Sequence, residues 1–468
     1  MTVAAGVILA TIDGSIVNIA LPTMVEELHT SFAVVQWVHL AYLLALAALS
    51  LGVGRWGDVA GKKRIYATGF GAFTAASLLC GMAPGVEWLI AFRAIQAIGA
   101  TMVLALGVAI LTESYPPGER GKALGWIGTA VSMGIVTGPV VGGLLLSSFS
   151  WRSIFLVNLP VGIAGTLLAI RYVPDTPPLP GQRFDWTGAG LLGLSLTTLT
   201  LGVNLAQGRA WTDPLILSLL VGATLLGLGF VAVERRHPHP MINLGLFRNR
   251  LLTAGIATGF LTFVSVTSMF LLMPFFLEGV LGLTVRQTGL VMAASPLALG
   301  VVAPISGSLS DRFGARGITT AGAALLAVAY LRLSGITANF TVSRYLWLAV
   351  PVGIGMGVFQ SPNNTAVMNS VPIHYLGVGS SLLNLTRLLG QIVGAATLGS
   401  LWANRVAAHL GRPLPIEGAP AAPASAQVAG FQDTYRVAAA LMLIAVVICL
   451  WALRHDLSTR PHPGLKSR

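Results

Sequence analysis

One carboxylate lies where ionisable groups are rare. Of the 16 acidic residues, only Asp13 falls deep inside an apolar stretch, residues 2–26. The rise of a helix places it about 18 Å from Met1, just past the midplane of a bilayer. An ionised carboxylate costs at least about 2.5–3.5 kcal/mol there. We therefore expect Asp13 to hold a proton in a dry state and to release it when water or a cation arrives. The alternative is a structural aspartate, bonded to Asn18 or to a neighbouring arginine.

Two arginines also fall inside apolar stretches. Arg93 comes five residues after Trp88, about 8 Å inside one face of its predicted helix. One interpretation is that its side chain snorkels outward to the interface. Arg387 lies ten residues into its predicted helix, near the midplane. It must therefore face the protein interior or water, paired with carbonyls or a carboxylate, and it could equally bind an anionic substrate.

Uncharged polar side chains in the same stretches are candidates to line a cavity between helices. Each of them alone is more often a hydrogen-bonding contact between helices. Met273 could belong to an adaptable apolar wall around a ligand, with lipid or core contact as the alternative. The polar candidates are Asn18, Gln96, Asn363, Asn364 and Asn384.

The composition is that of a membrane protein. The 468 residues are 54% hydrophobic and 9% charged, whereas soluble domains carry about 25% charged residues. The net charge is +12, but the basic residues stand between apolar runs, which indicates membrane orientation and not nucleic-acid binding. Cys80 and Cys449 lie in apolar stretches, so we expect neither a disulfide framework nor a metal site. The sequence has no P-loop, H-E-x-x-H or G-x-S-x-G motif, so we expect no cofactor, no ATP and no enzymatic activity.

About 14 stretches are long enough to cross a bilayer core of roughly 30 Å as helices. We therefore expect an all-α polytopic membrane protein with both termini on one side. The loops on the Met1 side hold 18 lysines and arginines and the opposite loops hold six, which predicts that the Met1 side is cytoplasmic. The predicted spans are 2–26, 34–54, 64–84, 87–112, 121–147, 154–172, 187–207, 213–233, 251–277, 286–309, 317–336, 344–369, 377–403 and 433–453.

Two loops on the Met1 side share a pattern 253 positions apart. Residues 54–63 read GRWGDVAGKK and residues 307–316 read GSLSDRFGAR, both G-x-x-x-D-x-x-G followed by basic residues. Repeated halves are typical of secondary transporters, whose substrate site lies between the halves. The repeat predicts a first six-helix bundle (1–173), a linker with two inserted helices (174–249), a second six-helix bundle (250–455) and a cytoplasmic tail (456–468).

Asp58 and Asp311 occupy matching positions of the two copies. A carboxylate at such a helix end can accept hydrogen bonds from the N-terminus of a neighbouring helix or pair with arginine, and so hold one side shut. The alternative is a plain turn whose basic residues only set the topology. The predicted latch comprises Gly54, Asp58, Gly61, Lys62, Lys63, Gly307, Asp311, Gly314 and Arg316.

Further stretches complete a resemblance to a known family. Residues 11–22 (TIDGSIVNIALP) resemble the first-helix signature of the 14-helix drug:proton antiporters of the major facilitator superfamily. Residues 54–63 match the superfamily's loop motif, and residues 93–99 (RAIQAIG) resemble its fourth-helix motif, with Ala97 in place of the usual glycine. Residues 134–143 (GIVTGPVVGG) are similar to the antiporter motif of the fifth helix. Residues 151–152, 155–160, 185–188 and 355–387 also fit this branch.

The resemblance implies the major facilitator fold, with two six-helix bundles and two inserted helices. It also implies a proton-coupled antiporter that exports amphipathic drugs, cationic or neutral, with Asp13 as the proton or cation site. In that family Arg93 would tune the protonation of a carboxylate or relay polarity. The small residues of the fifth helix would seal the halves against each other, or only pack closely; they are Gly134, Gly138, Pro139, Gly142 and Gly143.

Two other functions remain open. One is a dedicated exporter of a single metabolite, lipid or siderophore, with Arg387 holding an anion. The other is a membrane sensor or scaffold, although a scaffold gains nothing from an acid such as Asp13 inside the membrane. The expected partners are the lipid bilayer of the cytoplasmic membrane, protons and small amphipathic substrates, and not nucleic acid. A periplasmic adaptor is compatible with the sequence.

Overall fold

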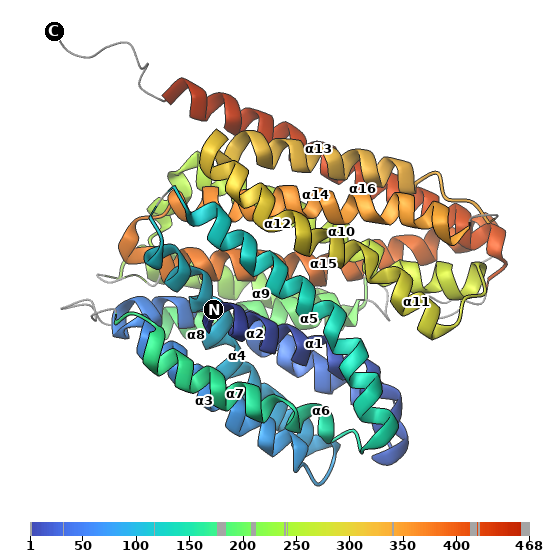
Figure 1. Ribbon diagram of the computed structural model, residues 1–468, viewed down its shortest axis with the longest axis horizontal. Helices are drawn as coiled ribbons and strands as arrows, with labels where there is room; N and C mark the ends of the chain where they lie inside the picture. Colours follow the sequence, from blue (N-terminus) through green and yellow to red (C-terminus); the bar gives the residue numbers. More distant parts are fainter. Residues whose placement is uncertain are drawn as a thin grey trace.

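The computed structural model describes residues 2–30, 32–116, 118–175, 184–206, 212–237, 240, 242–338, 341–411, 419 and 422–459. Within these residues the chain folds into long helices and contains no strand (Figure 1). Ten of the described helical segments are long and apolar enough to cross a membrane. Four more long helices, α1, α3, α13 and α15, occupy the remaining predicted positions. The predicted all-α fold class is confirmed.

The first half of the chain forms six helical spans, and the sixth is divided in two. Asn158 begins the longer part of that span. The helices are α1 (Thr2–Glu27), α2 (Phe32–Ala60), α3 (Lys62–Gly81), α4 (Val86–Ser114), α5 (Arg120–Ser148), α6 (Ser153–Leu156) and α7 (Asn158–Tyr172).

Two helices follow before the second half, α8 (Trp186–Leu205) and α9 (Pro214–Glu234). The carboxylate of Asp213 accepts a hydrogen bond from the backbone N–H of Leu215, which caps α9 next to the proline at its first turn. The two helices pack against each other, and α8 also contacts α2 and α15. They therefore lie beside the seam between the two halves.

The second half repeats the order of six spans. Its first span continues as a short π-helix, and its second span is divided in two. The elements are η1 (Leu244–Arg248), α10 (Arg250–Pro274), η2 (Phe275–Val280), α11 (Val285–Met292), α12 (Ala294–Phe313), α13 (Ala315–Leu333), α14 (Val342–Asn369), η3 (Ile373–Tyr375), α15 (Leu376–Leu410) and α16 (Ala424–Thr459).

The last helix differs from its predicted span. We expected a helix over 433–453 and a tail from 456, whereas α16 extends from Ala424 to Thr459. Alanine and other helix-forming residues lengthen it at both ends beyond the apolar core. The rest of the predicted tail lies outside the described residues.

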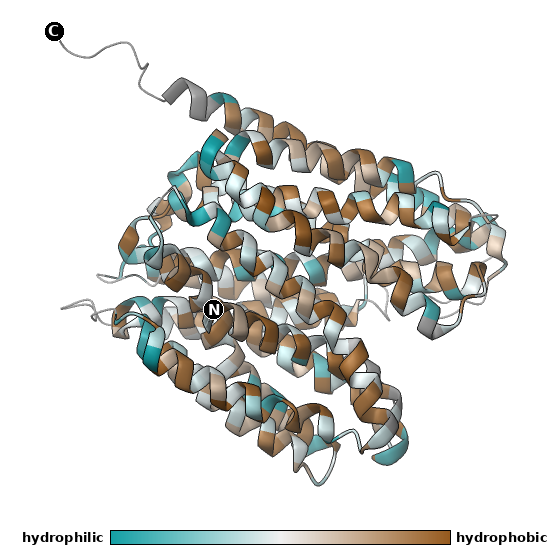
Figure 2. Ribbon diagram, in the orientation of Figure 1, coloured by the Kyte–Doolittle hydropathy of each residue, from teal (hydrophilic) through white to brown (hydrophobic). Residues whose placement is uncertain are grey.

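Hydrophobic residues predominate along the helices, and hydrophilic residues gather toward the helix ends (Figure 2). Large apolar side chains such as Leu167, Leu225 and Val447 are exposed, whereas Asp13 and Arg93 are fully buried. In soluble proteins charged residues are rarely fully buried, and large exposed apolar patches are rare. The arrangement fits a surface covered by lipid.

The two halves meet through few helices. In the described residues, α2, α4 and α5 of the first half contact α12, α14 and α15 of the second (Figure 1). At this seam the Ser132 hydroxyl donates to the carbonyl of Pro296, and the Thr129 hydroxyl donates to that of Gly300 at 2.6 Å. The seam positions the groups described next.

Candidate functional site

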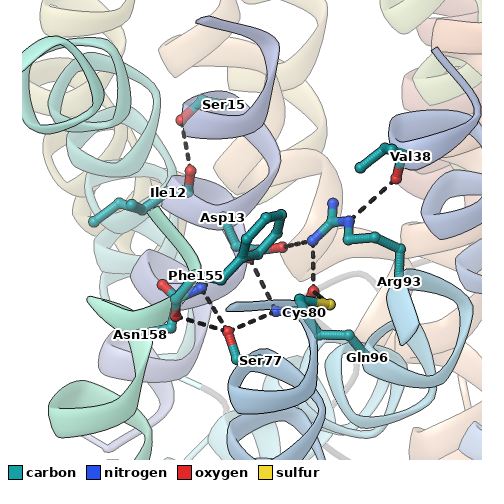
Figure 3. A network of polar contacts seen from close by, with 10 residues as sticks. All are labelled: Ile12, Asp13, Ser15, Val38, Ser77, Cys80, Arg93, Gln96, Phe155 and Asn158. Carbon is teal, nitrogen blue, oxygen red and sulfur yellow. Dashed lines mark hydrogen bonds and ion pairs between the residues drawn. The ribbon is translucent and has the colours of Figure 1, made fainter. Parts of the chain in front are cut away.

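A buried ion pair lies inside the first half (Figure 3). Nη1 of Arg93 on α4 is 2.7 Å from Oδ2 of Asp13 on α1, and both side chains have 0% exposure. The other carboxylate oxygen, Oδ1, accepts hydrogen bonds from Nε2 of Gln96 at 3.0 Å and from Nδ2 of Asn158 at 2.8 Å. Helices α1, α4 and α7 therefore converge on one carboxylate.

A second layer of hydrogen bonds fixes these partners. The Ser77 hydroxyl on α3 accepts from Gln96 at 3.0 Å and from Asn158 at 3.1 Å, and it donates to the carbonyl of Phe155. Oε1 of Gln96 accepts from Arg93 Nη1 at 2.6 Å. Each amide thus bonds several partners at once, which holds the carboxylate in one orientation.

The guanidinium of Arg93 also lies on aromatic rings. It is 4.1 Å from the ring centre of Tyr42 and 5.6 Å from that of Phe155, and its Nε donates to the carbonyl of Val38. Ring faces attract cations most strongly when water is absent. The snorkelling interpretation of Arg93 is therefore wrong, because the side chain turns inward.

The ion pair bears on both interpretations of Asp13. The carboxylate is bonded to a neighbouring arginine, as the structural interpretation expected, and its side chain has no exposure in this conformation. Protonation would remove the charge that Arg93 balances, so a proton on Asp13 and the ion pair exclude each other electrostatically.

Sequence reasoning missed Ser77, Asn158 and Tyr42 as parts of this site. Asn158 lies in the FLVNLP stretch that supported the family resemblance, and this was a usable signal. Ser77 and Tyr42 carry no such signal. Their roles follow only from the packing of α2 and α3 against α1 and α4.

The two repeated aspartates contact helix N-termini of the opposite half. The Asp58 carboxylate accepts from the backbone N–H groups of Gly377 at 2.9 Å and Val378 at 3.1 Å, at the start of α15. The Asp311 carboxylate accepts from those of Gly121 at 2.8 Å and Lys122 at 2.9 Å, at the start of α5. Helix N-termini carry free N–H groups and partial positive charge, which suits a carboxylate. We propose that these two contacts form the interhalf latch.

Glycines explain the rest of the repeated pattern. A Cβ on Gly54 would lie 2.5 Å from the carbonyl oxygen of Gly377, and one on Gly307 would collide with the backbone of Gly121. Gly61 and Gly314 adopt positive φ values of 94° and 88°, which favour glycine. In each copy the first glycine thus permits a helix crossing and the last permits a turn.

The basic residues of the pattern have unequal roles. Lys62 lies 2.9 Å from Asp58 and 2.8 Å from Glu113, so it joins the ends of α2 and α4. Lys63 pairs at 3.1 Å with Asp175, an exposed carboxylate, and such a pair adds little stability. Nη1 of Arg316 in the second copy donates to the carbonyl of Leu251, at the start of α10.

Asp58→Asn and Asp311→Asn are each expected to weaken the interhalf latch. A hydrogen bond to a charged group contributes about 1.5–3 kcal/mol, so each change should raise the population with separated Met1-side ends by roughly 10-fold to 100-fold. The labelling rate of a cysteine placed at Ser361, which is buried against Gly121, measures this population. Asp433→Asn, at the other end of the helices, is the matched control. A labelling rate unchanged by both latch variants would contradict the latch.

The small residues of α5 pack inside the first half. A Cβ on Gly134 would lie 2.6 Å from Thr11 Cβ, one on Gly138 would collide with Ser15, and one on Gly142 would lie 2.8 Å from Ile16. A Cβ on Gly143 would meet no atom within 4 Å. These contacts join α5 to α1, which corrects the interpretation of a seal between the halves. The side chain of Pro139 lies outside the described residues.

Two cavity candidates belong instead to the second half's interior. Met273 is fully buried in its apolar core, with Tyr330 and Phe431 in the same cluster. Nδ2 of Asn363 donates to the carbonyl of Gly255 at 3.1 Å, a contact between α14 and α10. Met273 thus makes the core contact, and Asn363 the hydrogen-bonding contact between helices, that the alternative interpretations expected.

Of the other candidates, Gln96 belongs to the Asp13 site, whereas Asn384 and Arg387 lie at the seam between the halves. Gln96 bonds Asp13, while Nδ2 of Asn384 donates to the Ser50 hydroxyl across the seam at 3.3 Å. Asn364 is half-buried, with no hydrogen bond to the described residues. Arg387, one turn beyond Asn384, donates from Nη2 to the Asn384 side chain at 2.9 Å. The side chain of Asn18 lies outside the described residues.

Comparison with known proteins identifies the family. The family model of the Major Facilitator Superfamily matches residues 3–395. The chain belongs to this superfamily. It is 34% identical over 451 residues to the riboflavin transporter RibZ of Clostridioides difficile (strain 630), covering 96% of each chain. It is 33% identical over 420 residues to the multidrug resistance protein Stp of Mycobacterium tuberculosis (strain ATCC 25618 / H37Rv), covering 88% of this chain and 77% of Stp.

A solved structure agrees with the family assignment. The proton:xylose symporter XylE superposes with a TM-score of 0.65 at 14% identity, over 96% of this chain and 94% of that one. This likeness concerns the fold. The resemblance to the superfamily is confirmed, and the chain is a multi-pass membrane transporter of the Major Facilitator Superfamily.

Proposed function

We propose that this transporter is a proton-coupled antiporter that exports amphipathic organic compounds. The observation that carries the proposal is the ion pair of Asp13 and Arg93, buried at the meeting point of four helices. A transporter that only shuttled a neutral solute would have no use for a buried charge pair, because buried charges are costly. The name of Stp, a multidrug resistance protein, supports drug-like cargo.

The proposed cycle alternates between two arrangements of the halves. With the interhalf latch formed, the ends of α2 and α15 and those of α5 and α12 are held together. A proton taken up by Asp13 frees Arg93 from its counter-ion, and the cost of that unpaired charge biases the halves toward the arrangement in which water reaches the site. Loss of the proton restores the pair.

Asp13 also bears on the charge of the cargo. Its two oxygens are bonded to Arg93, Gln96 and Asn158, so a cationic drug would have to displace Arg93 to reach it. We therefore assign Asp13 to the proton and not to direct contact with a cation.

We further propose an orientation and a division into units. The excess of lysine and arginine in the Met1-side loops supports a cytoplasmic Met1 side and C-terminus, in the cytoplasmic membrane. The bundles 1–173 and 250–455 would move against each other. The linker 174–249 carries α8, which contacts α2 and α15 at the seam, and α9, which packs against α8.

Dye uptake into inverted membrane vesicles tests the antiport proposal. Vesicles with and without the protein would be energised and offered ethidium, riboflavin and a carboxylated xanthene dye in turn. We expect accumulation of at least one compound that stops when an uncoupler is added, with proton release from the lumen. Accumulation that survives the uncoupler, or no accumulation of any compound, would contradict the proposal.

A dedicated exporter is the second candidate. The name of RibZ, a riboflavin transporter, and the half-buried charge of Arg387, whose Nε is buried without a hydrogen-bond partner, favour it. In the same vesicles, uncoupler-sensitive uptake of one compound with no competition from the others would identify this narrower function.

A further inference from the structure

Arg387 is a half-buried cation at the seam between the halves. Its Nη2 donates to Asn384, but its Nε is buried and has no hydrogen-bond partner. No carboxylate of the described residues pairs with it. An unpaired charge inside a membrane protein is costly and marks a functional site. Water or a bound anion must therefore balance the charge of Arg387.

The remaining buried acids cannot supply this balance. Asp58 lies in the interhalf latch, while Asp185 and Glu234 lie beside α8 and α9, where Asp185 caps α8. Asp13 is already paired with Arg93. These four are the buried carboxylates of the described residues. The seam therefore keeps one uncompensated positive charge at the depth of Arg387.

A second buried polar group without a hydrogen-bond partner lies on α2, which packs against α15 across the seam. The Tyr42 side chain is 2% exposed, and its hydroxyl is buried without a hydrogen-bond partner. Tyr42 lies on α2 and Arg387 on α15, two helices that contact each other and are joined by the bond between Asn384 and Ser50. The Tyr42 ring covers the guanidinium of Arg93. Tyr42 comes from the first half and Arg387 from the second. Buried polar atoms are nearly always bonded. An unbonded hydroxyl on α2 and an unbonded Nε on α15, two helices in contact across the seam, therefore point to a ligand between the halves.

We propose that Arg387 and the Tyr42 hydroxyl bind an oxyanion of the transported compound, such as a carboxylate. The proposal rests on the proposed transport function and assigns the charge of its substrate. A guanidinium offers parallel N–H groups that match the two oxygens of a carboxylate. Asn384, itself tied to Ser50 across the seam, holds Nη2 of Arg387 and leaves Nε for the ligand.

The charge of the cargo has a measurable electrical consequence. Export of a monoanion against one entering proton moves two positive charges inward per cycle. Exchange of a proton for a monocation moves none. An inside-negative potential is therefore expected to accelerate transport of the acid, and a potential without effect on it would contradict an anionic substrate.

Binding to the purified protein in detergent tests the site without a proton gradient, so its outcome is separate from that of the antiport proposal. The probes are a xanthene dye with a free carboxylate and the methyl ester of the same dye, followed by fluorescence anisotropy. We expect the free acid to bind about 10-fold to 100-fold more tightly than the ester. Arg387→Gln should abolish this preference, because the affinity for the acid falls to that for the ester. Arg387→Lys should restore part of it, and Tyr42→Phe should reduce it.

Arg405→Gln on the same helix is the matched control, because Arg405 is exposed and only loosely paired with Asp433. Ester binding reports whether each variant is folded. Equal affinity of wild type for acid and ester would overturn the proposal, as would an undiminished preference in Arg387→Gln. Loss of both ligands in Arg387→Gln and Arg387→Lys alike would show a structural role instead. Competition by chloride, without preference for the carboxylate, would assign the site to an inorganic anion and also overturn it.

Discussion

Asp13→Asn is expected to abolish uncoupler-sensitive accumulation, down to the level of vesicles that lack the protein. Asparagine cannot carry the proton, and it leaves the Arg93 guanidinium buried without its counter-ion. Removal of one partner of a buried pair costs about 3–5 kcal/mol, so the variant should also unfold at a lower temperature. Dye accumulation in energised vesicles and thermal unfolding of the purified protein measure the two effects.

The double variant Asp13→Asn with Arg93→Gln separates coupling from stability. Because neither charge remains, it should regain much of the lost stability yet stay uncoupled. Asp175→Asn, which changes an exposed carboxylate, is the control for the loss of an acid. Uncoupler-sensitive accumulation retained by Asp13→Asn would exclude this residue as the proton site.

Gly54→Val and Gly307→Val are expected to stop transport by preventing closure of the Met1 side. In each case the new side chain would meet backbone of the opposite half, at Gly377 or Gly121. Backbone atoms in packed helices cannot yield as a flexible side chain can. The effect should therefore exceed that of Asp58→Asn or Asp311→Asn, which weaken the same contact without blocking it.

Cysteine labelling checks this ranking. A cysteine at Ser361, which contacts the Gly121 carbonyl at 3.0 Å, should react fastest with a membrane-impermeant maleimide in the two valine variants. Cys80 and Cys449 are buried and would be replaced by alanine to remove background. Gly71→Val is the matched control, since a Cβ there meets no atom within 4 Å. Slow labelling and full transport in Gly307→Val would show that this crossing need not open and close.

Much of the fold follows from local sequence, because a bilayer requires helices of nearly fixed length. Apolar length alone located the spans, and the repeat of 54–63 at 307–316 revealed the two halves. Asp13 stood out because an acid inside an apolar run is costly wherever the helix packs. The aspartates of the repeat were likewise predicted to meet a helix N-terminus or an arginine, because they lie at helix ends, and the structure shows the first of these partners.

Partners across helices depended on the tertiary structure. Residue types showed that Arg93 was unusual, but only the packing of α4 against α1 turned it inward to Asp13 instead of outward to lipid. The glycines of α5 have the same spacing whichever neighbour they face, so the sequence left their contact with α1 open. For the same reason Met273 was indistinguishable from a cavity residue until its core neighbours were known. Sequence determines what a side chain costs at a given depth, whereas the rotation of each helix about its axis decides which group relieves that cost.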